Sequence, residues 1–337
     1  MKAILVLEDG TVFEGTSFGA EGEAVGEIIF NTQVVGYQEI ITDPAYRGQI
    51  IAMGYPHIGN YGINDNCYES DSAQASAMVV LENSKIYSNW QAKGSLSDFM
   101  KKHKVIGIEG IDTRTLTIHI RDHGEMRAVV STKEFNVEKL LEKAKKYQLP
   151  DLVSDIKSQA PSSKQNKSKT VIINLGVNKS TLDNFPGAAI VPYDSKAGEV
   201  MELTPELVVL SGGPGDPRKL TGLINEIKKM IGKVPLRGFQ NGACVLALAL
   251  GCSVTRMKVG HHGVNHPVVD PKTGCGEISV QNHSYGIEKV PPNVQIVHVN
   301  LNDKTIEAFK TTDSKCEGSL YFLIDERGKL EKGYKRV

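Results

Sequence analysis

The sequence has few cysteines and no excess charge of either sign. Its five cysteines are scattered through 337 residues without a C-x-x-C pair, so neither a disulfide framework nor a thiolate zinc site is expected. Its 39 Lys and Arg residues balance 39 Asp and Glu residues, so the chain has no electrostatic attraction for nucleic acid or an anionic membrane. We therefore expect partners that are small molecules or proteins, with no nucleic acid and no membrane.

Long hydrophobic runs are also missing. The longest apolar run, residues 243–250, is far shorter than the roughly 20 residues that cross a bilayer. The N-terminus reaches Glu8 and Asp9 without the apolar segment of a signal peptide, which favours a reducing, cytoplasmic setting. Hydrophobic residues nevertheless make up 40% of the 337 residues, enough for globular cores, and this length indicates two domains of about 100 to 200 residues.

The first half is rich in strand-like segments separated by glycine and aspartate turns. Residues 3–7 and 11–14 flank Asp9-Gly10, a pair that supplies the positive φ angles of a tight hairpin turn. Further strands are expected at residues 28–31, 50–53, 77–81 and 105–108, and helices at 95–102, capped by Ser95 or Ser97, and 136–147. These segments predict a mixed, β-rich α/β domain over residues 1–153.

A composition change separates this domain from the second half. Residues 154–170 are rich in Ser, Lys, Gln and Asn and contain little to bury, which predicts a solvated linker. Residues 171–337 then alternate short apolar strands with helices. The strands are expected at 171–174, 188–191, 207–210 and 235–239, and the helices at 220–231 and 242–250. Apolar strands without alternation indicate a mostly parallel sheet covered on both faces.

Three segments at predicted strand ends are candidates for a functional site, because ligands bind there in parallel sheets. Residues 211–217 form a glycine-rich turn whose backbone N–H groups can face a ligand, or merely a tight connection. Gly238 and Gly242 flank Gln240 at a strand-to-helix junction, the arrangement of a nucleophile elbow. Residues 281–283 (Gln-Asn-His) follow a strand expected at 277–280.

A series of motifs along almost the whole chain is more specific. The first half contains LEDGT (7–11), FNT (30–32), GYQE (36–39), ITDP (41–44), GNYG (59–62) and IDTR (111–114). The second contains LSGGPGDP (210–217), GHHG (260–263), NHPV (265–268), QNH (281–283) and HVNLND (298–303). In this order the motifs resemble the small, glutamine-amidotransferase subunit of carbamoyl-phosphate synthetase. The resemblance implies an N-terminal domain that docks on a large subunit, followed by a class I glutamine amidotransferase-like domain.

The catalytic positions of that family are altered in this chain. In the family the elbow carries a cysteine that attacks the side-chain amide of glutamine, and here Gln240 occupies that position. The family's histidine base and its orienting glutamate correspond to Leu323 and Asp325. Because a carboxamide supplies no thiolate and an alkyl group accepts no proton, the resemblance predicts a degenerate triad with no intact catalytic residue.

The glutamine pocket of the family is only partly preserved. Its vestigial positions here are Ala45, Gly213, Gly215, Asn241, Cys244, Asn282, Ser284 and Tyr285. Three of them, Gly213, Gly215 and Asn282, match the family, whereas Ala45, Asn241, Cys244 and Ser284 replace its usual residues. Cys244 lies one turn into the helix among small apolar neighbours, which predicts packing in a core rather than a relocated nucleophile.

Four histidines, His261, His262, His266 and His283, invite a metal-site interpretation. The resembling family has the first two and His283 without a metal, so we expect structural or hydrogen-bonding roles, with no metal and no cofactor. At the C-terminus the chain departs from the family, and the apolar residues on either side of Gly328 predict a terminal β-hairpin in place of the family's last helix.

The leading hypothesis is a homologue of the small subunit that lacks glutaminase activity. It would serve as a structural or regulatory subunit of an ammonia-using carbamoyl-phosphate synthase, in a heteromer with the large subunit, for pyrimidine or arginine biosynthesis. One alternative is a non-catalytic sensor protein that binds glutamine. The other is an amidotransferase with residual or altered activity through Cys244.

Overall fold

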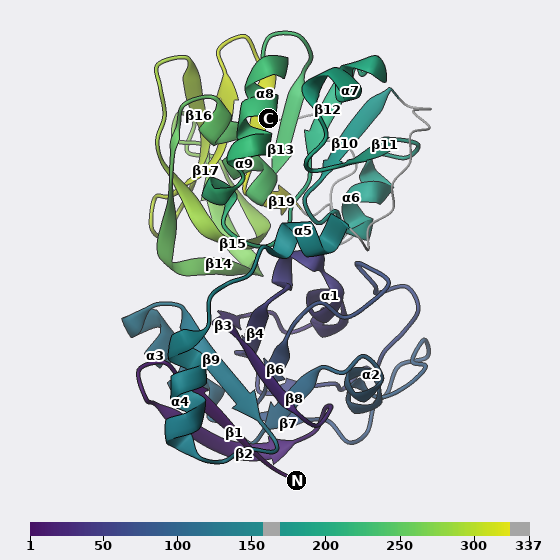
Figure 1. Ribbon diagram of the computed structural model, residues 1–337, viewed down its shortest axis with the longest axis vertical. Helices are drawn as coiled ribbons and strands as arrows, with labels where there is room; N and C mark the ends of the chain where they lie inside the picture. Colours follow the sequence, from purple (N-terminus) through teal and green to yellow (C-terminus); the bar gives the residue numbers. More distant parts are fainter. Residues whose placement is uncertain (158–168, 324–337) are drawn as a thin grey trace. The chain divides into compact units, whose positions relative to one another are not determined.

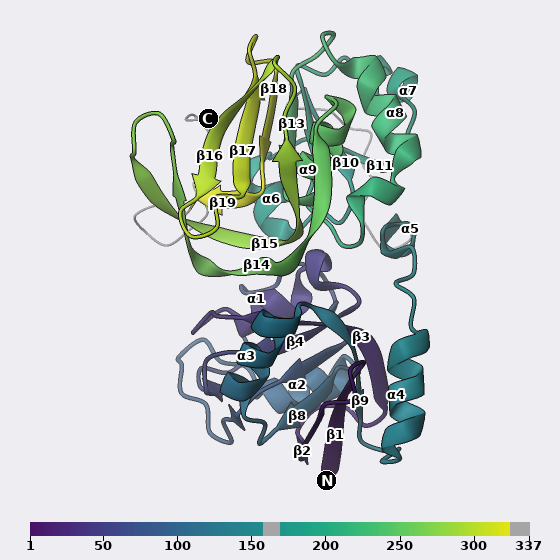
Figure 2. The ribbon, with the colours of Figure 1, turned by 90° about the vertical axis from the view of Figure 1, so that its left-hand side faces the viewer.

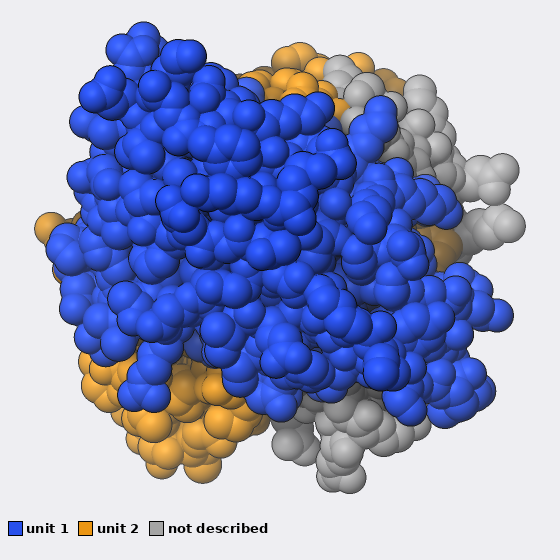
Figure 3. Space-filling view, turned by 90° about the horizontal axis from the view of Figure 1, so that it is seen from below, with its two compact units in different colours: residues 1–150 blue, residues 151–337 orange. Residues whose placement is uncertain are grey.

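The computed structural model describes residues 1–157 and 169–323, which form two compact units, Met1–Pro150 and Asp151–Val337. Figure 3 colours the two units separately. Each unit has hydrophobic cores of its own, and each is described by itself below.

The first unit is built on a closed β-barrel with strand order β1-β2-β8-β6-β4-β3-β9, in which β9 pairs with β1 (Figure 1). The strands are β1 (Lys2–Leu7), β2 (Val12–Ser17), β3 (Glu23–Asn31), β4 (Gln49–Met53), β6 (Ala77–Val79), β8 (Ile106–Glu109) and β9 (Met126–Ser131). A separate pair joins β5 (His57–Ile58) and β7 (Glu82–Asn83). The predicted hairpin is confirmed, because β1 and β2 pair antiparallel around Gly10, whose φ is 94°.

The helices of this unit are α1 (Tyr37–Thr42), α2 (Leu96–Lys102), α3 (Thr113–His123) and α4 (Val137–Lys146), with the 3-10 turn η1 (Pro44–Tyr46). The predicted helices α2 and α4 are confirmed, and Ser95 and Asn136 accept capping hydrogen bonds from Asp98 N and Lys139 N. Helices α1 and α3 were not predicted from the sequence. The threonines and isoleucines of α3 favour a strand, but Leu116 and Ile120 reach the barrel core at helical spacing.

The second unit contains a ten-stranded sheet with order β11-β10-β12-β13-β18-β17-β16-β14-β15-β19. The strands are β10 (Thr170–Asn174), β11 (Ala189–Pro192), β12 (Leu207–Leu210), β13 (Leu236–Phe239), β14 (Ser253–Val269), β15 (Gly276–Lys289), β16 (Val294–Asn300), β17 (Ile306–Thr311), β18 (Cys316–Ser319) and β19 (Tyr321–Leu323). Among the described strands of this sheet only the pairings from β11 to β18 are parallel, so the expectation of a mostly parallel sheet holds for this part alone. The remaining pairings are antiparallel and include the long hairpin β14–β15, visible in Figure 2.

Helices cover both faces of the parallel part of this sheet, as the apolar strands predict. The helices are α5 (Leu152–Lys157), α6 (Lys179–Asn184), α7 (Ala197–Glu202), α8 (Thr221–Met230) and α9 (Asn241–Ala249), with the 3-10 turn η2 (Pro217–Lys219). Val171 and Ile173 of β10 join the core beneath α7, α8 and α9. Ile172, between them in sequence, joins the opposite core with Leu182 of α6. The expected mixed α/β fold class is confirmed.

One expectation about the region between the domains was wrong. Residues 154–157, expected as solvated linker, belong to α5, because Leu152, Val153 and Ile156 form one buried apolar face. The rest of the expected linker, 158–168, and the expected terminal hairpin beyond residue 323 lie outside the described residues. Within the described part of the chain, no helix is long and apolar enough to cross a membrane.

Candidate functional site

The strand-to-helix junction at Gln240 keeps the backbone of a nucleophile elbow. Gln240 lies between β13 and α9 with φ 48° and ψ −120°, a conformation that non-glycine residues rarely adopt. Its N–H donates to Ser319 O at 2.8 Å, and its carbonyl accepts from Ala243 N at 3.0 Å and Cys244 N at 3.2 Å. These backbone bonds fix the sharp turn independently of the side chain at position 240.

Two glycines beside the elbow allow three backbone segments to approach closely. A Cβ added to Gly238 would lie 2.6 Å from Gly242 O, and one added to Gly242 would lie 2.3 Å from Leu210 O. Neither distance is compatible with a side chain, so the ends of β12 and β13 and the first turn of α9 require glycine here. The local geometry therefore follows directly from this glycine spacing.

The Gln240 side chain lies against the glycine-rich turn that follows β12. Gln240 is 4% exposed, and a Cβ added to Gly212 would lie 2.1 Å from its Oε1. The Asn241 Nδ2 group donates to Gly213 O at 2.7 Å and to Gly215 O at 3.0 Å. The structure thus brings Gly213, Gly215, Gln240 and Asn241 together, and the Asn241 carboxamide hydrogen-bonds the turn to the elbow.

The third candidate segment lies in a different place from the one predicted. Residues 281–283 lie in the middle of β15 and not at the end of a strand. There Asn282 and His283 pair with His262 and His261 of the neighbouring strand β14. The error arose because polar residues were taken to end a strand, whereas a partner strand satisfies this backbone. Asn282 Oδ1 accepts from His262 Nδ1 at 2.7 Å, while the buried Asn282 Nδ2 has no partner among the described residues.

The remaining predicted pocket positions lie in β15 or in the first unit. Ser284 Oγ is 3.4 Å from His262 Nε2, and the Arg218 guanidinium lies 5.3 Å from the Tyr285 ring centre. Ala45 lies in η1 of the first unit, where its N–H donates to Asp43 Oδ1 at 2.9 Å. Leu323 ends β19, its backbone paired with Ser279 of β15, and Asp325 lies outside the described residues.

Cys244 is fully buried within α9, as predicted. Its Sγ donates a weak hydrogen bond to Tyr285 O at 3.8 Å. Burial, with a smaller contribution from the charge of Glu307, raises the pKa of the Cys244 thiol well above its usual range. A thiol that is neither ionised nor accessible is poorly suited to nucleophilic attack.

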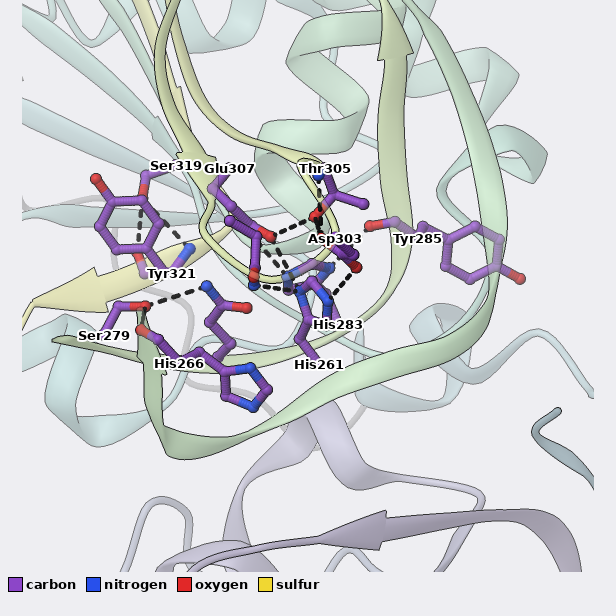
Figure 4. Close-up of polar contacts among 12 residues, drawn as sticks. His261, His266, Ser279, His283, Tyr285, Asp303, Thr305, Glu307, Ser319 and Tyr321 are labelled. Atoms are coloured by element: carbon purple, nitrogen blue, oxygen red, sulfur yellow. Dashed lines mark hydrogen bonds and ion pairs between the residues drawn. The ribbon is translucent and has the colours of Figure 1, made fainter. Parts of the chain in front are cut away.

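A buried cluster beside this region was missed from the sequence, because Glu307 belongs to none of the motifs noticed there. His261, His283 and Glu307 come from β14, β15 and β17, and their side chains converge in Figure 4. Burial alone would lower the pKa of His261, but its bonds to Asp303 and Glu307 raise it to about 9. Burial alone would raise the pKa of Glu307, but the neighbouring histidines lower it to about 2. The cluster therefore stabilises positive charge.

The second unit has the fold of the class I glutamine amidotransferases. The sequence model described as glutamine amidotransferase class-I matches residues 182–319 and ends before Leu323. The model described as carbamoyl-phosphate synthase small chain, CPSase domain, matches residues 5–130. A solved structure of a glutamine amidotransferase from Thermotoga maritima is 20% identical, with a TM-score of 0.35, and covers 45% of this chain and 74% of its own.

Two carbamoyl phosphate synthase small chains are similar to almost the whole sequence. The protein of Clostridium perfringens (strain 13 / Type A) is 41% identical over 315 residues, which cover 92% of this chain and 90% of that protein. The protein of Aquifex aeolicus (strain VF5) is 41% identical over 334 residues, which cover 91% and 90%. The chain therefore belongs to the carbamoyl phosphate synthase small chain family, which confirms the resemblance drawn from the motifs.

Proposed function

We propose that this chain is a small-subunit homologue without glutaminase activity, acting as a structural or regulatory subunit of an ammonia-using carbamoyl-phosphate synthase. The observation that carries the proposal is the elbow itself. Gln240 holds the strained elbow conformation, and its side chain lies against the glycine-rich turn at Gly212. The place of the nucleophile is thus filled by a buried carboxamide, which is itself a glutamine side chain.

The chemistry of the other positions supports the same proposal. A carboxamide cannot form a covalent acyl intermediate as a thiolate does, and Leu323 cannot accept a proton. Loss of the nucleophile or the base of a catalytic triad costs on the order of 10⁶-fold in turnover. Cys244, the nearest thiol in sequence, is fully buried, so it offers no replacement nucleophile.

The partner follows from the family. We propose that the first unit, residues 1–150, docks on a carbamoyl-phosphate synthase large subunit, and that the second unit, which begins at residue 151, is the amidotransferase-like domain. The large subunit would carry the ATP-dependent chemistry with free ammonia as its nitrogen source. Its product would serve pyrimidine or arginine biosynthesis, in the cytoplasm.

The first prediction tests this function with purified protein. The chain is co-purified with a candidate large subunit, and carbamoyl phosphate formation is measured with ammonia and with glutamine in parallel. We expect a rate with ammonia only, and no glutamate release from glutamine, because the elbow holds no nucleophile. The Gln240→Ala variant should behave the same in both assays. Glutamate release that a substitution at Gln240, Cys244 or Asn282 abolishes would refute the proposal.

One observation favours a second candidate function, a glutamine sensor without turnover. The glycine-rich turn is retained, and Asn282 Nδ2 is buried without a partner among the described residues, so it is free to donate to an amide ligand. Isothermal titration with glutamine separates the two candidates, since tight binding without hydrolysis supports the sensor.

The remaining alternative, residual activity through Cys244, is tested by mapping the adduct of an electrophilic glutamine analogue. No adduct at Cys244 excludes it.

A further inference from the structure

The buried cluster of His261, His283 and Glu307 has the composition and spacing of a metal site. His261 Nδ1 lies 2.9 Å from Glu307 Oε1, and His283 Nε2 lies 3.2 Å from Glu307 Oε2. One donor atom from each residue lies within 4.8 Å of the others. Donors bound to one tetrahedral zinc ion at about 2.0 to 2.1 Å are separated by roughly 3.3 Å, so small side-chain shifts would suffice.

Both histidines are oriented by partners on the side away from Glu307. His283 Nδ1 donates to Tyr285 O at 3.0 Å, which leaves Nε2 directed at the carboxylate. His261 Nε2 lies 2.9 Å from Asp303 Oδ2, and Asp303 accepts in turn from Thr305 N and Oγ1 at 3.0 and 2.7 Å. Metal-binding histidines usually donate their second ring N–H to a carbonyl or a carboxylate in this way.

Buried polar atoms in the cluster lack hydrogen-bond partners among the described residues. His283 and Glu307 are 4% and 0% exposed, yet His283 Nε2 and Glu307 Oε2 face each other without hydrogen-bonding geometry. A carbonyl accepts the Nδ1 proton of His283, so its Nε2 meets the carboxylate, 3.2 Å away, as a second acceptor unless the ring is doubly protonated or a metal ion lies between them. Such an arrangement is costly in a protein interior unless it is compensated.

We propose that His261 Nδ1, His283 Nε2 and the Glu307 carboxylate bind one divalent transition-metal ion of the zinc class, with a fourth position open to water. Two imidazoles and a carboxylate are ligands that suit zinc. The two positive charges of the ion would be balanced by the carboxylates of Glu307 and Asp303. The ion would tie together β14, β15 and β17, which supply its three ligands.

This site is separate from the proposed loss of glutaminase activity. Glu307 is linked to the elbow through the backbone: its carbonyl accepts from Leu320 N, and the neighbouring Ser319 carbonyl accepts from Gln240 N. A metal here would hold the strands behind the elbow in place without contacting position 240. Metal binding and glutamine hydrolysis can therefore be measured independently, and either result can fail alone.

The second prediction is tested by metal titration of the purified full chain. The protein is stripped with a chelator, titrated with Zn²⁺ against a chromophoric competitor, and separately loaded with Co²⁺ for visible spectroscopy. We expect about one equivalent of Zn²⁺, a Co²⁺ spectrum of a four-coordinate site, and a higher Tm in the loaded protein. Substoichiometric binding together with no Co²⁺ spectrum would show that the cluster is only a hydrogen-bonded network, and would overturn the proposal.

Variants identify the ligands and guard against a folding failure. Glu307→Gln keeps the size of a buried ligand and should lose at least about 100-fold in Zn²⁺ affinity. Asp303→Asn changes an orienting side chain that is 43% exposed, and should lose about 10-fold to 100-fold while remaining folded. His298→Gln, a half-buried change on β16 outside the group, should bind as the parent does. Zn²⁺ affinity that neither Asp303→Asn nor a folded Glu307→Gln lowers would overturn the assignment.

Discussion

At the scale of single residues, Gln240 shows how main-chain contacts hold a strained strand-to-helix elbow in place. Residues held in such sparsely populated conformations cost about 1 to 3 kcal/mol each and persist because their surroundings impose them. Here the surroundings are backbone bonds to Ser319 and Ala243, together with the glycines at 238 and 242. None of these contacts depends on the identity of the side chain at position 240.

The third prediction measures that strain with two matched variants. Gln240→Gly and Gln240→Ala remove nearly the same side chain, but only glycine adopts a φ of 48° at little cost. We expect the glycine variant to be more stable than the alanine variant by about 1 kcal/mol in urea denaturation. Equal stabilities, or a more stable alanine variant, would mean that the turn relaxes when the side chain is removed.

Sequence reasoning succeeded for the residues whose role is local and failed where distant strands meet. The elbow at Gln240 follows from a short glycine motif, and the burial of Cys244 follows from its small apolar neighbours. The partnership of Glu307 with His261 and His283 depends on the pairing of three strands, and a sequence separation of 46 residues between Glu307 and His261 gives no signal of it. The role first expected for these histidines, without a metal, is the one that the titration above now tests.

At the scale of elements, predictions were reliable where burial is continuous and poor where it alternates with polar contacts. The strands β10, β12 and β13 were found from apolar runs, because both faces of a parallel sheet are covered. The hairpin β14–β15 was largely missed, since its histidines and asparagines are buried by pairing with each other. Helix α3 was missed for a different reason: its β-branched residues favour a strand locally, but packing overrode that propensity.

The fourth prediction concerns the contact between α9 and β12. A methyl group at position 242 would lie 2.3 Å from Leu210 O and 2.5 Å from Ser211 O, so Gly242→Ala must displace the helix or the strand. We expect a loss of roughly 3 kcal/mol in the free energy of unfolding, measured by urea denaturation. Gly222→Ala in α8 is the matched control, because its methyl group would meet nothing within 4 Å. That control should gain about 0.5 to 1 kcal/mol. A Gly242→Ala protein as stable as its control would contradict the close approach.

At the scale of the whole molecule, the two units differ in how their sheets end. The first unit closes its main sheet into a barrel through β1 and β9, whereas the sheet of the second unit is open, with β11 and β19 as the outermost of its described strands. The hydrophobic clusters of the first unit lie entirely within residues 1–150, with residues from β1, β3, β4 and β9 among others. A closed sheet with its own core has what a domain needs to fold alone.

The fifth prediction follows from that closure. Residues 1–150 produced alone should give a monomer that unfolds in a single cooperative transition with heat, because no strand of the barrel takes its pairing partner from elsewhere. Calorimetry and circular dichroism would measure the transition. A fragment without cooperative unfolding would show that the first unit depends on the rest of the chain.

The closed barrel also limits how another subunit can recognise the first unit. Partners often bind by adding a strand to an exposed sheet edge, where main-chain hydrogen bonds supply affinity with little regard to sequence. The barrel offers no such edge, since each of its strands is paired on both sides. A subunit that docks on the barrel must therefore read side chains and loops, so that its choice of partner depends on sequence rather than on strand addition.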